Sequence, residues 1–388
     1  MPDLVLIEPA ASPDWLPFAH SRPTSELRAG IWLIRERWEA IVGGETRHLI
    51  GPSHLHGFVE DGVPPVRAAG PVEGPVVVGR SAFAPSGTPV ELGNDPARLM
   101  NEGSVVGWWV PSGHTWEHED FAGDEVEVDG LLLHGAFDLI HALELLLQPD
   151  TADFVREMAD PIPDGCIVIG DPHEVVILGA AVEPGVIFDV REGPVVLEQH
   201  AYVNSGSRLE GPLYVGPASQ IVGGRVAWSV VGPHCKVRGE VAHSVFLGFA
   251  NKGHDGFLGH SVIGRWANLG AGTTTSNLKN TYGPIRLEIA GQRIETGRQF
   301  LGSLVGDHAK TAIGTMLPTG TVVGVGANVF GAPRAPKYVP PFAWGDTGDV
   351  MNQEGFIRIA ERVLPRRHVT VTDDIRAMLD AIYRAATS

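Results

Sequence analysis

The sequence predicts an α/β domain followed by a parallel β-helix of six-residue repeats and a short helical tail. Aliphatic residues recur at every sixth position in the middle of the chain. Strand-like and helix-like apolar segments alternate in the first 160 residues, and two amphipathic helical patterns follow the repeats. A period of six fits neither a helix, at 3.6 residues, nor a simple strand, at two. It suits a chain that turns a corner every sixth residue and buries one side chain there.

The first predicted unit, residues 1–160, alternates strands with helices, which is the pattern of an α/β domain. Its apolar runs and helical spacings set the expected elements. These are strands at Leu4–Ile7, Val76–Val78 and Val105–Val106, helices through Leu27, Ile31, Ile34 and Trp38 and over Ala136–Leu147, and a linker over 148–165.

The repeat region, residues 166–335, is expected to form the β-helix. Its period breaks between Asn277 and Phe300, which predicts a loop extruded from the coil, and such loops commonly carry binding groups. The residues expected to point inward are Leu197, Val203, Leu209, Val215, Ile221, Phe257, Ile263, Leu269, Leu317, Val323 and Val329.

The tail, residues 350–388, is expected to form two helices. Phe356, Ile359, Ala360 and Val363 share one helical stripe, and a second helix is expected to begin after Thr372 as its cap. Both stripes indicate packing rather than chemistry.

Composition limits the function classes. The net charge of −17 argues against a general nucleic-acid binder, because phosphate-backbone binding depends on Lys and Arg. Two cysteines cannot form a disulfide framework, and no leader or apolar run of about 18 residues is seen, so a soluble cytoplasmic protein without a membrane partner is expected. All five lysines lie beyond residue 235, which hints that some sites there require a compact ammonium group.

A dense group of motifs lies between residues 251 and 310. A Gly-His pair, an aromatic-Leu-Gly step and an Asn-aliphatic-Gly-Ala-Gly-Thr run ending in Asn resemble the acetyltransferase half of bifunctional enzymes that acetylate glucosamine-1-phosphate and then uridylylate the product. An Arg-Pro-x-x-Glu-Leu-Arg-x-Gly motif near the start resembles the opening motif of a bacterial branch of that superfamily, whose members have a reduced nucleotidyltransferase domain. The motif residues are Gly253-His254, Phe257-Leu258-Gly259, Asn268-Leu269-Gly270-Ala271-Gly272-Thr273, Asn277, and residues 22–30.

The resemblance implies a left-handed β-helix and acetyl transfer from acetyl-CoA to the amine of a hexosamine-1-phosphate, in nucleotide-sugar synthesis. His254 matches the general base, and a histidine suits this role because it titrates near neutral pH. Asn268 and Asn277 match asparagines that hold the sugar and line the reacting carbonyl, where an amide offers donor and acceptor without charge. The alternative for both is an asparagine tolerated at a left-handed turn.

The resemblance also implies anion and coenzyme contacts. Arg238 matches an arginine that contacts the sugar phosphate, and Lys252 and Lys279 are further anion candidates. The coenzyme is expected near Gly302 and Ser303, where small residues leave room. A homotrimer with active sites between neighbouring subunits is expected.

Several departures from the family pattern concern the substrate. Phe257 and Leu278 stand where relatives usually have tyrosine, so two hydroxyl contacts are missing, and Tyr282 in the extruded loop is a candidate substitute. The first strand leads into a segment without the Gly-rich loop of sugar nucleotidylyltransferases, and no lysine precedes Lys236. UTP or dTTP as substrate, and Mg²⁺ with it, are expected only if this first unit is active.

Three other functions remain open. One is sugar-1-phosphate nucleotidylyl transfer by the first unit, which would make the enzyme bifunctional. Another is a non-catalytic trimeric scaffold or sugar-nucleotide sensor. The third is zinc-dependent hydration, because some left-handed β-helices carry histidine sites between subunits, although no metal is expected here. The histidines concerned are His234, His243, His254, His260 and His308.

Overall fold

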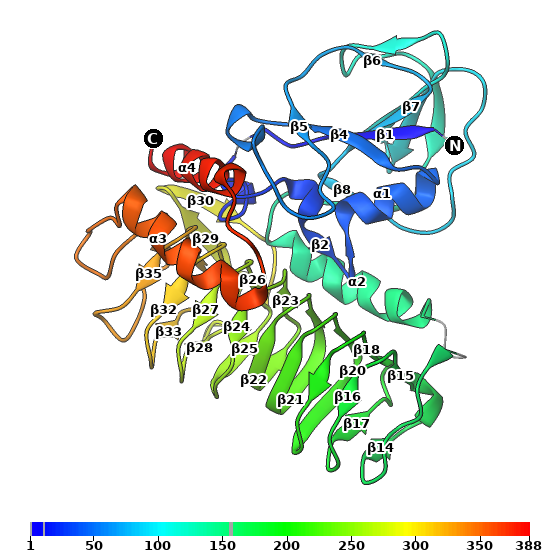
Figure 1. Ribbon diagram of the computed structural model, residues 1–388. Coiled ribbons are helices and arrows are strands. Elements are labelled where there is room, and N and C mark those ends of the chain that lie inside the picture. Colours follow the sequence, from blue (N-terminus) through cyan, green and yellow to red (C-terminus); the bar gives the residue numbers. More distant parts are fainter. Residues whose placement is uncertain (1, 11, 155–157) are drawn as a thin grey trace.

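The computed structural model describes residues 2–10, 12–154 and 158–388. An N-terminal α/β domain lies over one side of a long parallel β-solenoid, and two C-terminal helices pack beside both (Figure 1). This is the predicted fold class.

The N-terminal domain is built on a seven-stranded mixed sheet in the order β12-β9-β10-β7-β1-β4-β5. The central strands β7, β1, β4 and β5 run parallel, and β10 is antiparallel to β7. Three predicted strands are confirmed as β1, β7 and β10. The bounds are β1 Asp3–Ile7, β4 Thr46–Ile50, β5 Val66–Arg67, β7 Val76–Arg80, β9 Ala97–Asn101, β10 Ser104–Val110 and β12 Asp124–Glu127, with small pairs β2 Arg28–Ala29 and β3 Trp32–Leu33, β6 Val72–Glu73 and β11 Thr115–Trp116, and β8 Phe83–Pro85 and β13 Gly130–Leu132.

Two of the expected elements in this domain were wrong in extent. Helix α1 spans Ile34–Val42, so Leu27 and Ile31 are buried but not helical. The hairpin β2–β3 precedes α1 and turns at Gly30, whose φ of +67° favours glycine. Helix α2 spans Asp138–Ala152 and continues into the expected linker. Its end is fixed because the Asp150 carboxylate accepts the Ile31 main-chain N–H at 2.8 Å. Residues 155–157 of that linker lie outside the described residues.

The solenoid has three parallel faces, and equivalent residues on successive coils are usually 15 to 21 positions apart, as in Lys236↔Asn251 and Ile187↔Arg208. Three hexapeptides make one such coil, which confirms the meaning of the six-residue period. The open face comprises β16 Ala181–Val182, β19 Tyr202–Val203, the start of β21 Gln220–Val231, the start of β22 Lys236–Ala242, β24 Asn251–Lys252, β27 Asn268–Leu269, β32 Lys310–Thr311 and β35 Asn328–Val329.

The other two faces follow in each coil. The second face comprises β14 Ile167–Ile169, β17 Ile187–Asp189, the start of β20 Ser207–Val215, the middle of β21, the end of β22, β25 Phe257–Gly259, β28 Thr274–Thr275 and β33 Met316–Leu317. The covered face comprises β15 Val175–Ile177, β18 Val195–Leu197, the ends of β20 and β21, β23 Val245–Phe246, β26 Val262–Ile263, β31 Ser303–Val305, β34 Thr321–Val323 and β36 Tyr338–Val339.

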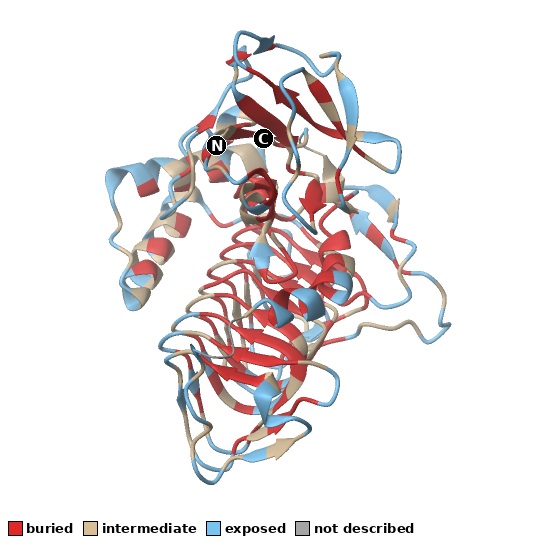
Figure 2. Ribbon diagram, turned by 90° about the vertical axis from the view of Figure 1, so that its right-hand side faces the viewer, coloured by how far each residue is buried: buried red, intermediate tan, exposed pale blue. Residues whose placement is uncertain are grey.

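The interior of the solenoid is a column of aliphatic side chains, and Figure 2 shows buried residues along its inside. All the residues expected to point inward are buried except Phe257. Phe257 is half-buried, and its neighbour Leu258, at 0 % exposure, fills the interior opposite Val241. The repeat therefore slips by one residue in the segment that carries Gly253-His254.

The covered face is apolar on both sides of the strand. Its outward side chains, including Val196, Tyr214 and Val230, join the core of the N-terminal domain, and α2 packs against β20, β21 and β23. This explains the uninterrupted apolar runs of strands such as β18, because a strand buried on both sides loses the alternation of a half-exposed one.

The predicted extruded loop contains a hairpin, β29 Arg286–Ile289 and β30 Gln292–Glu295, which packs against β34. The tail forms α3 Gln353–Val363, a 3₁₀ turn over Leu364–Arg367 and α4 Asp373–Thr387. Thr372 caps α4 as expected, because its hydroxyl accepts the Ile375 N–H at 3.2 Å. Within the described residues, every helix is too short or too polar to cross a bilayer.

Candidate active site

The open face carries a column of polar side chains, one from each coil from Tyr202 onward. Strand pairing places Lys236 beside Asn251, Asn251 beside Asn268, and Asn268 beside Lys310. The Asn251 amide nitrogen donates to the Asn268 oxygen at 2.7 Å, which leaves the Asn268 nitrogen as a donor for another group. Among the described residues, the outward side chains of this face do not join the core of the N-terminal domain, unlike those of the covered face, and the column can therefore be polar.

Lys252 occupies an inward position of this face, opposite Val237 of the preceding coil. It is 1 % exposed, and its ammonium donates to the main-chain oxygens of Arg238 at 3.1 Å and His254 at 2.5 Å. Burial lowers its pKa to about 8, although the nearby Asp255 opposes this shift. The expectation that Lys252 binds an anion is therefore corrected, because its nitrogen points into the coil and fixes the corner that bears His254.

His254 lies at that corner with an exposed side chain. Arg238, one coil earlier, donates to the Asp255 carboxylate at 3.0 Å and to the Val222 oxygen at 2.8 Å. The guanidinium is therefore held next to the residue that follows His254. By strand register, Arg238, His254 and Asn268 lie on successive coils, on or directly after the open face.

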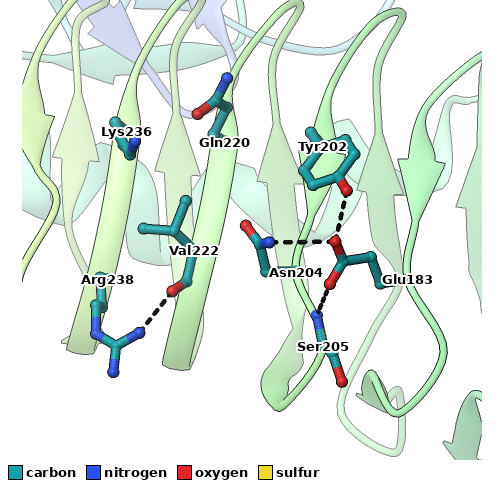
Figure 3. A pocket seen from close by; sticks show the side chains of 8 residues that line it. All are labelled: Glu183, Tyr202, Asn204, Ser205, Gln220, Val222, Lys236 and Arg238. Carbon is teal, nitrogen blue, oxygen red and sulfur yellow. Dashed lines mark hydrogen bonds between the residues drawn. The ribbon is translucent and has the colours of Figure 1, made fainter.

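A cavity of about 640 Å³ opens on the same face between the coils that bear Tyr202 and Arg238 (Figure 3). Glu183 accepts hydrogen bonds there from the Tyr202 hydroxyl at 2.5 Å and the Ser205 N–H at 2.7 Å. Its other walls are Asn204, Gln220, Val222, Lys236 and Arg238. Amide, hydroxyl and cationic groups, together with the Glu183 carboxylate, make this shallow cavity suitable for a polar small molecule.

Asn277 lies elsewhere, at the corner between the second and covered faces. Its side chain pairs with the His260 Nδ1 at 2.8 Å. Lys279 donates to the Pro284 oxygen in the extruded loop, and Tyr282 is 67 % exposed there. One chain therefore divides the predicted site residues between two sides of the solenoid.

Gly302 and Ser303 are corrected as a coenzyme-binding pair. Both are buried, and Ser303 has 0 % exposure. A Cβ on Gly302 would lie 2.0 Å from the Gly259 oxygen, so the small residue is required by close stacking of coils and does not make room for a ligand. The Ser303 N–H continues an internal serine ladder by donating to the Ser261 hydroxyl at 2.9 Å.

Glu144, His243 and His260 form a cluster with metal-binding atoms within 4.8 Å of one another. The two imidazole rings are stacked, with centroids 4.6 Å apart and planes inclined by 14°. A metal ion lies close to the plane of each ring that ligates it, and two nearly parallel planes at this separation share no such point. Burial and the neighbouring His243 lower the pKa of His260 to about 3, so the rings stack as neutral groups. The cluster therefore does not fit a zinc site.

The carboxyl edge of the parallel strands, where open α/β sheets bind ligands, is filled in this chain. Glu8, after β1, is buried and accepts the N–H groups of Thr24 and Ser25, and burial raises its pKa to about 7. Arg22 then donates to Asp307 of the solenoid at 2.8 Å and to Glu60 at 3.0 Å.

Comparison with known proteins agrees with the motifs. Residues 4–152 match the family model described as sugar nucleotidyl transferase. The chain is similar to bifunctional sugar-1-phosphate nucleotidylyltransferase/acetyltransferases. One such protein from Sulfurisphaera tokodaii is 31 % identical over 152 residues, which is 36 % of each chain. The bifunctional protein GlmU of Methanococcus vannielii is 32 % identical over 132 residues, covering 33 % of this chain and 27 % of the relative.

The similarity to these bifunctional proteins is partial, since the chain spans about a third of the length of the curated relatives it matches. A Bacillus cereus protein of known structure, provisionally described as an acetyltransferase, aligns with 54 % of this chain and 99 % of its own. That alignment has 14 % identity and a TM-score of 0.27, and carries no argument.

Sequence reasoning missed the polar column, because Asn251, Lys236 and Lys310 were not predicted as site residues. The six-residue pattern contained this information, because the residue before each inward position faces outward, and on the open face these residues are polar from Tyr202 onward.

Proposed function

We propose that this chain is an acetyl-CoA-dependent N-acetyltransferase that acts on a hexosamine-1-phosphate such as glucosamine-1-phosphate. One observation supports this above the others: His254 is exposed on a corner whose main chain is held by the buried Lys252 ammonium, and Arg238 is bonded to the next residue, Asp255. A base on a fixed stretch of main chain, close to a cation, is what acyl transfer to the amine of a phosphorylated sugar requires.

The proposed reaction uses the residues in order. Arg238 holds the sugar phosphate, and the neutral sugar amine attacks the thioester carbonyl carbon. The His254 ring accepts the proton that the amine loses, and the Asn268 amide nitrogen donates to the oxygen that becomes negative. The carbon–sulfur bond then breaks, and His254 returns the proton to the leaving thiolate. The products are the N-acetylated sugar phosphate and free coenzyme A.

The divided site supports a trimer in this proposal. Asn277, Lys279 and Tyr282 lie beyond the second face from His254, at another corner of the same chain, and a neighbouring copy would present its own set to His254. We infer a homotrimer with each site between two subunits, acting in the cytoplasm on small molecules.

Nucleotidylyl transfer by the N-terminal domain is the second candidate, favoured by the family match over residues 4–152. We rank it second because the strand edge at which a nucleoside triphosphate would bind is filled by Glu8, Arg22 and Glu60. Mg²⁺ would be needed only for this reaction.

The test is release of thiol from acetyl-CoA in the presence of glucosamine-1-phosphate. We expect turnover by the wild type and a loss of about 10² to 10⁴-fold for His254→Ala, because general-base catalysis contributes roughly that factor. His114→Ala, which changes an exposed histidine of the N-terminal domain, is the matched control and should retain full activity. Absence of thiol release from folded wild type with several amino sugar phosphates would refute the proposal.

A further inference from the structure

The corner between the second and covered faces carries a column of stacked rings from successive coils. Trp228, His243 and His260 follow one another, and Phe300 closes the stack where the extruded loop rejoins the coil. Neighbouring ring centroids lie 5.5, 4.6 and 5.1 Å apart. Trp228, His243 and His260 have φ angles of +46°, +47° and +48°. The main chain of this corner therefore accepts an indole ring as well as an imidazole.

His260 differs from the other rings because it holds the side chain of Asn277. The Asn277 amide nitrogen lies 2.8 Å from the His260 Nδ1. An amide nitrogen can only donate, so Nδ1 accepts and the proton of the neutral ring is on Nε2. Nε2 faces the carboxylate of Glu144, on α2, at 3.9 Å, which favours this tautomer. The Nδ1 of His243, one coil earlier, is buried and unpaired within the described residues.

Asn277 is fixed at its main chain and at one end of its amide. Its main-chain oxygen accepts the Leu301 N–H at 3.0 Å, and its side chain is half-buried. In the parts of the chain that the structure describes, its side-chain oxygen accepts no hydrogen bond, while its nitrogen is engaged by His260. A free amide offers a donor and an acceptor in either of two flipped orientations. Held in this way, Asn277 presents its oxygen as an acceptor.

An apolar ring lies next to this acceptor. A Cβ on Gly259 would lie 2.7 Å from the Asn277 amide nitrogen and 2.5 Å from the ring of Phe257. The amide and the ring therefore approach each other beside Gly259, which must be small. Phe257 is half-buried and follows the coil corner that bears His254. A fixed acceptor beside an apolar surface suits a small molecule that has both C–H groups and hydrogen-bond donors.

We propose that His260 is a positioning residue for the amino sugar, which holds the Asn277 amide in the orientation whose oxygen accepts a hydrogen bond from the sugar. The inference rests on the proposed acetyl transfer to a hexosamine-1-phosphate, whose amine and hydroxyl groups supply the donors. Without the His260 Nδ1, the Asn277 amide is free to rotate, and the sugar loses a fixed acceptor. Binding of coenzyme A does not depend on this contact.

The test is calorimetric titration of the full chain with glucosamine-1-phosphate and, separately, with coenzyme A. His260→Phe keeps a ring in the stack and removes the acceptor. It should weaken binding of the sugar phosphate about tenfold, the upper range for one hydrogen bond, and change coenzyme A affinity less than about twofold. His260→Asn removes the ring but places an amide oxygen as many bonds from the main chain as Nδ1, and this residue tolerates a positive φ. Its affinity for the sugar phosphate should stay within about threefold of wild type.

Two further measurements isolate the contact between His260 and Asn277. His243→Phe changes the preceding ring of the same stack and is the matched control, with an expected change below about twofold. In an Asn277→Ala background, His260→Phe should cause no further loss of sugar affinity, because a residue that acts only through another has no effect once its partner is gone. A further tenfold loss in that background would overturn the positioning role.

The remaining outcomes separate this role from the proposed activity. Unchanged sugar affinity in His260→Phe with a loss in His260→Asn would show that only the stacked ring matters, and would overturn the inference. The same result together with thiol release by the wild type would leave the transferase standing. The expected pattern of sugar binding without thiol release from acetyl-CoA would support the role of His260 and refute the transferase. A wild type that binds no glucosamine-1-phosphate would overturn both.

Discussion

Lys252 shows how a single residue links the solenoid core to the proposed chemistry. It stands in a column that is otherwise mostly aliphatic and uses its ammonium to hold two main-chain oxygens at the corner before His254. The sequence signal was visible, because the residue stands beside the Gly-His pair. The prediction that Lys252 contacts an anion was wrong. The repeat slips by one residue here, which turns Lys252 inward and Phe257 outward, and this slip cannot be seen in the six-residue period.

Lys252→Met keeps the length of the side chain and removes the charge. We expect kcat to fall about tenfold or more with the affinity for coenzyme A unchanged, because the main chain that carries the base loses its fixed position while Lys252 itself is buried away from any ligand. Lys337→Met, another lysine whose ammonium donates to a main-chain oxygen but on a later coil, is the control and should retain kcat. A loss of coenzyme A affinity equal to the loss of kcat would contradict a positioning role.

The same variant should alter the pH dependence of stability. The folded-state pKa of Lys252, about 8, lies below its ordinary value of 10.5, so between these values the unfolded chain holds a proton that the folded chain has lost. The free energy of unfolding therefore rises with pH through this window in the wild type. Urea unfolding at pH 8 and pH 10 should show a smaller rise in Lys252→Met, with Lys310 supplying part of what remains.

At the scale of elements, the sequence predicts structure best where its pattern has one interpretation. The six-residue period predicted the coils because each inward residue is selected by the same narrow interior. It could not predict that Leu27 and Ile31 lie outside α1, because the turn at Gly30 and the helix have the same apolar spacing. Nor could the period show that α2 covers a solenoid face. The strands of that face are apolar on both sides, which indicates only that something covers them.

The joint between the N-terminal domain and the solenoid depends on Arg22, which is 2 % exposed and pairs with Glu60 and Asp307. Arg22→Met should lower the free energy of unfolding by about 3–5 kcal/mol at pH 7, because two acids then lose their partner. Arg47→Met breaks an exposed pair with Asp3 and should cost no more than about 1 kcal/mol.

The effect of Arg22→Met should shrink in acid. Arg22 and Arg265 hold the pKa of Glu60 at about 2, below its ordinary value, so the pair stabilises the fold above about pH 4.5 and this contribution is lost as the pH falls toward 2. Urea unfolding of both proteins at pH 7 and pH 3 measures it. A difference between wild type and variant that stays constant with pH would show that packing, and not charge, maintains the joint.

For the whole molecule, the division of the predicted site is the feature that a sequence cannot display. Motif order places His254 and Asn277 within 23 positions of each other, but the two residues lie at different corners of the solenoid, with the second face between them. In the trimer implied by the family resemblance, the Asn277 corner of one subunit would lie next to the His254 corner of its neighbour.

Mixing two inactive variants tests whether subunits share the site. His254→Ala and Asn277→Ala should each lose acetyl transfer, but trimers assembled from an equal mixture should regain about a quarter of wild-type activity, because one interface in four then joins an intact His254 to an intact Asn277 of the next chain. The variants are mixed by co-expression, with separately purified proteins combined after assembly as the control. No recovery in co-assembled trimers of two well-folded variants would mean that each chain carries a whole site or that Asn277 serves only to hold His260. Recovery would establish that the open face of one subunit and the Asn277 corner of another together perform the reaction.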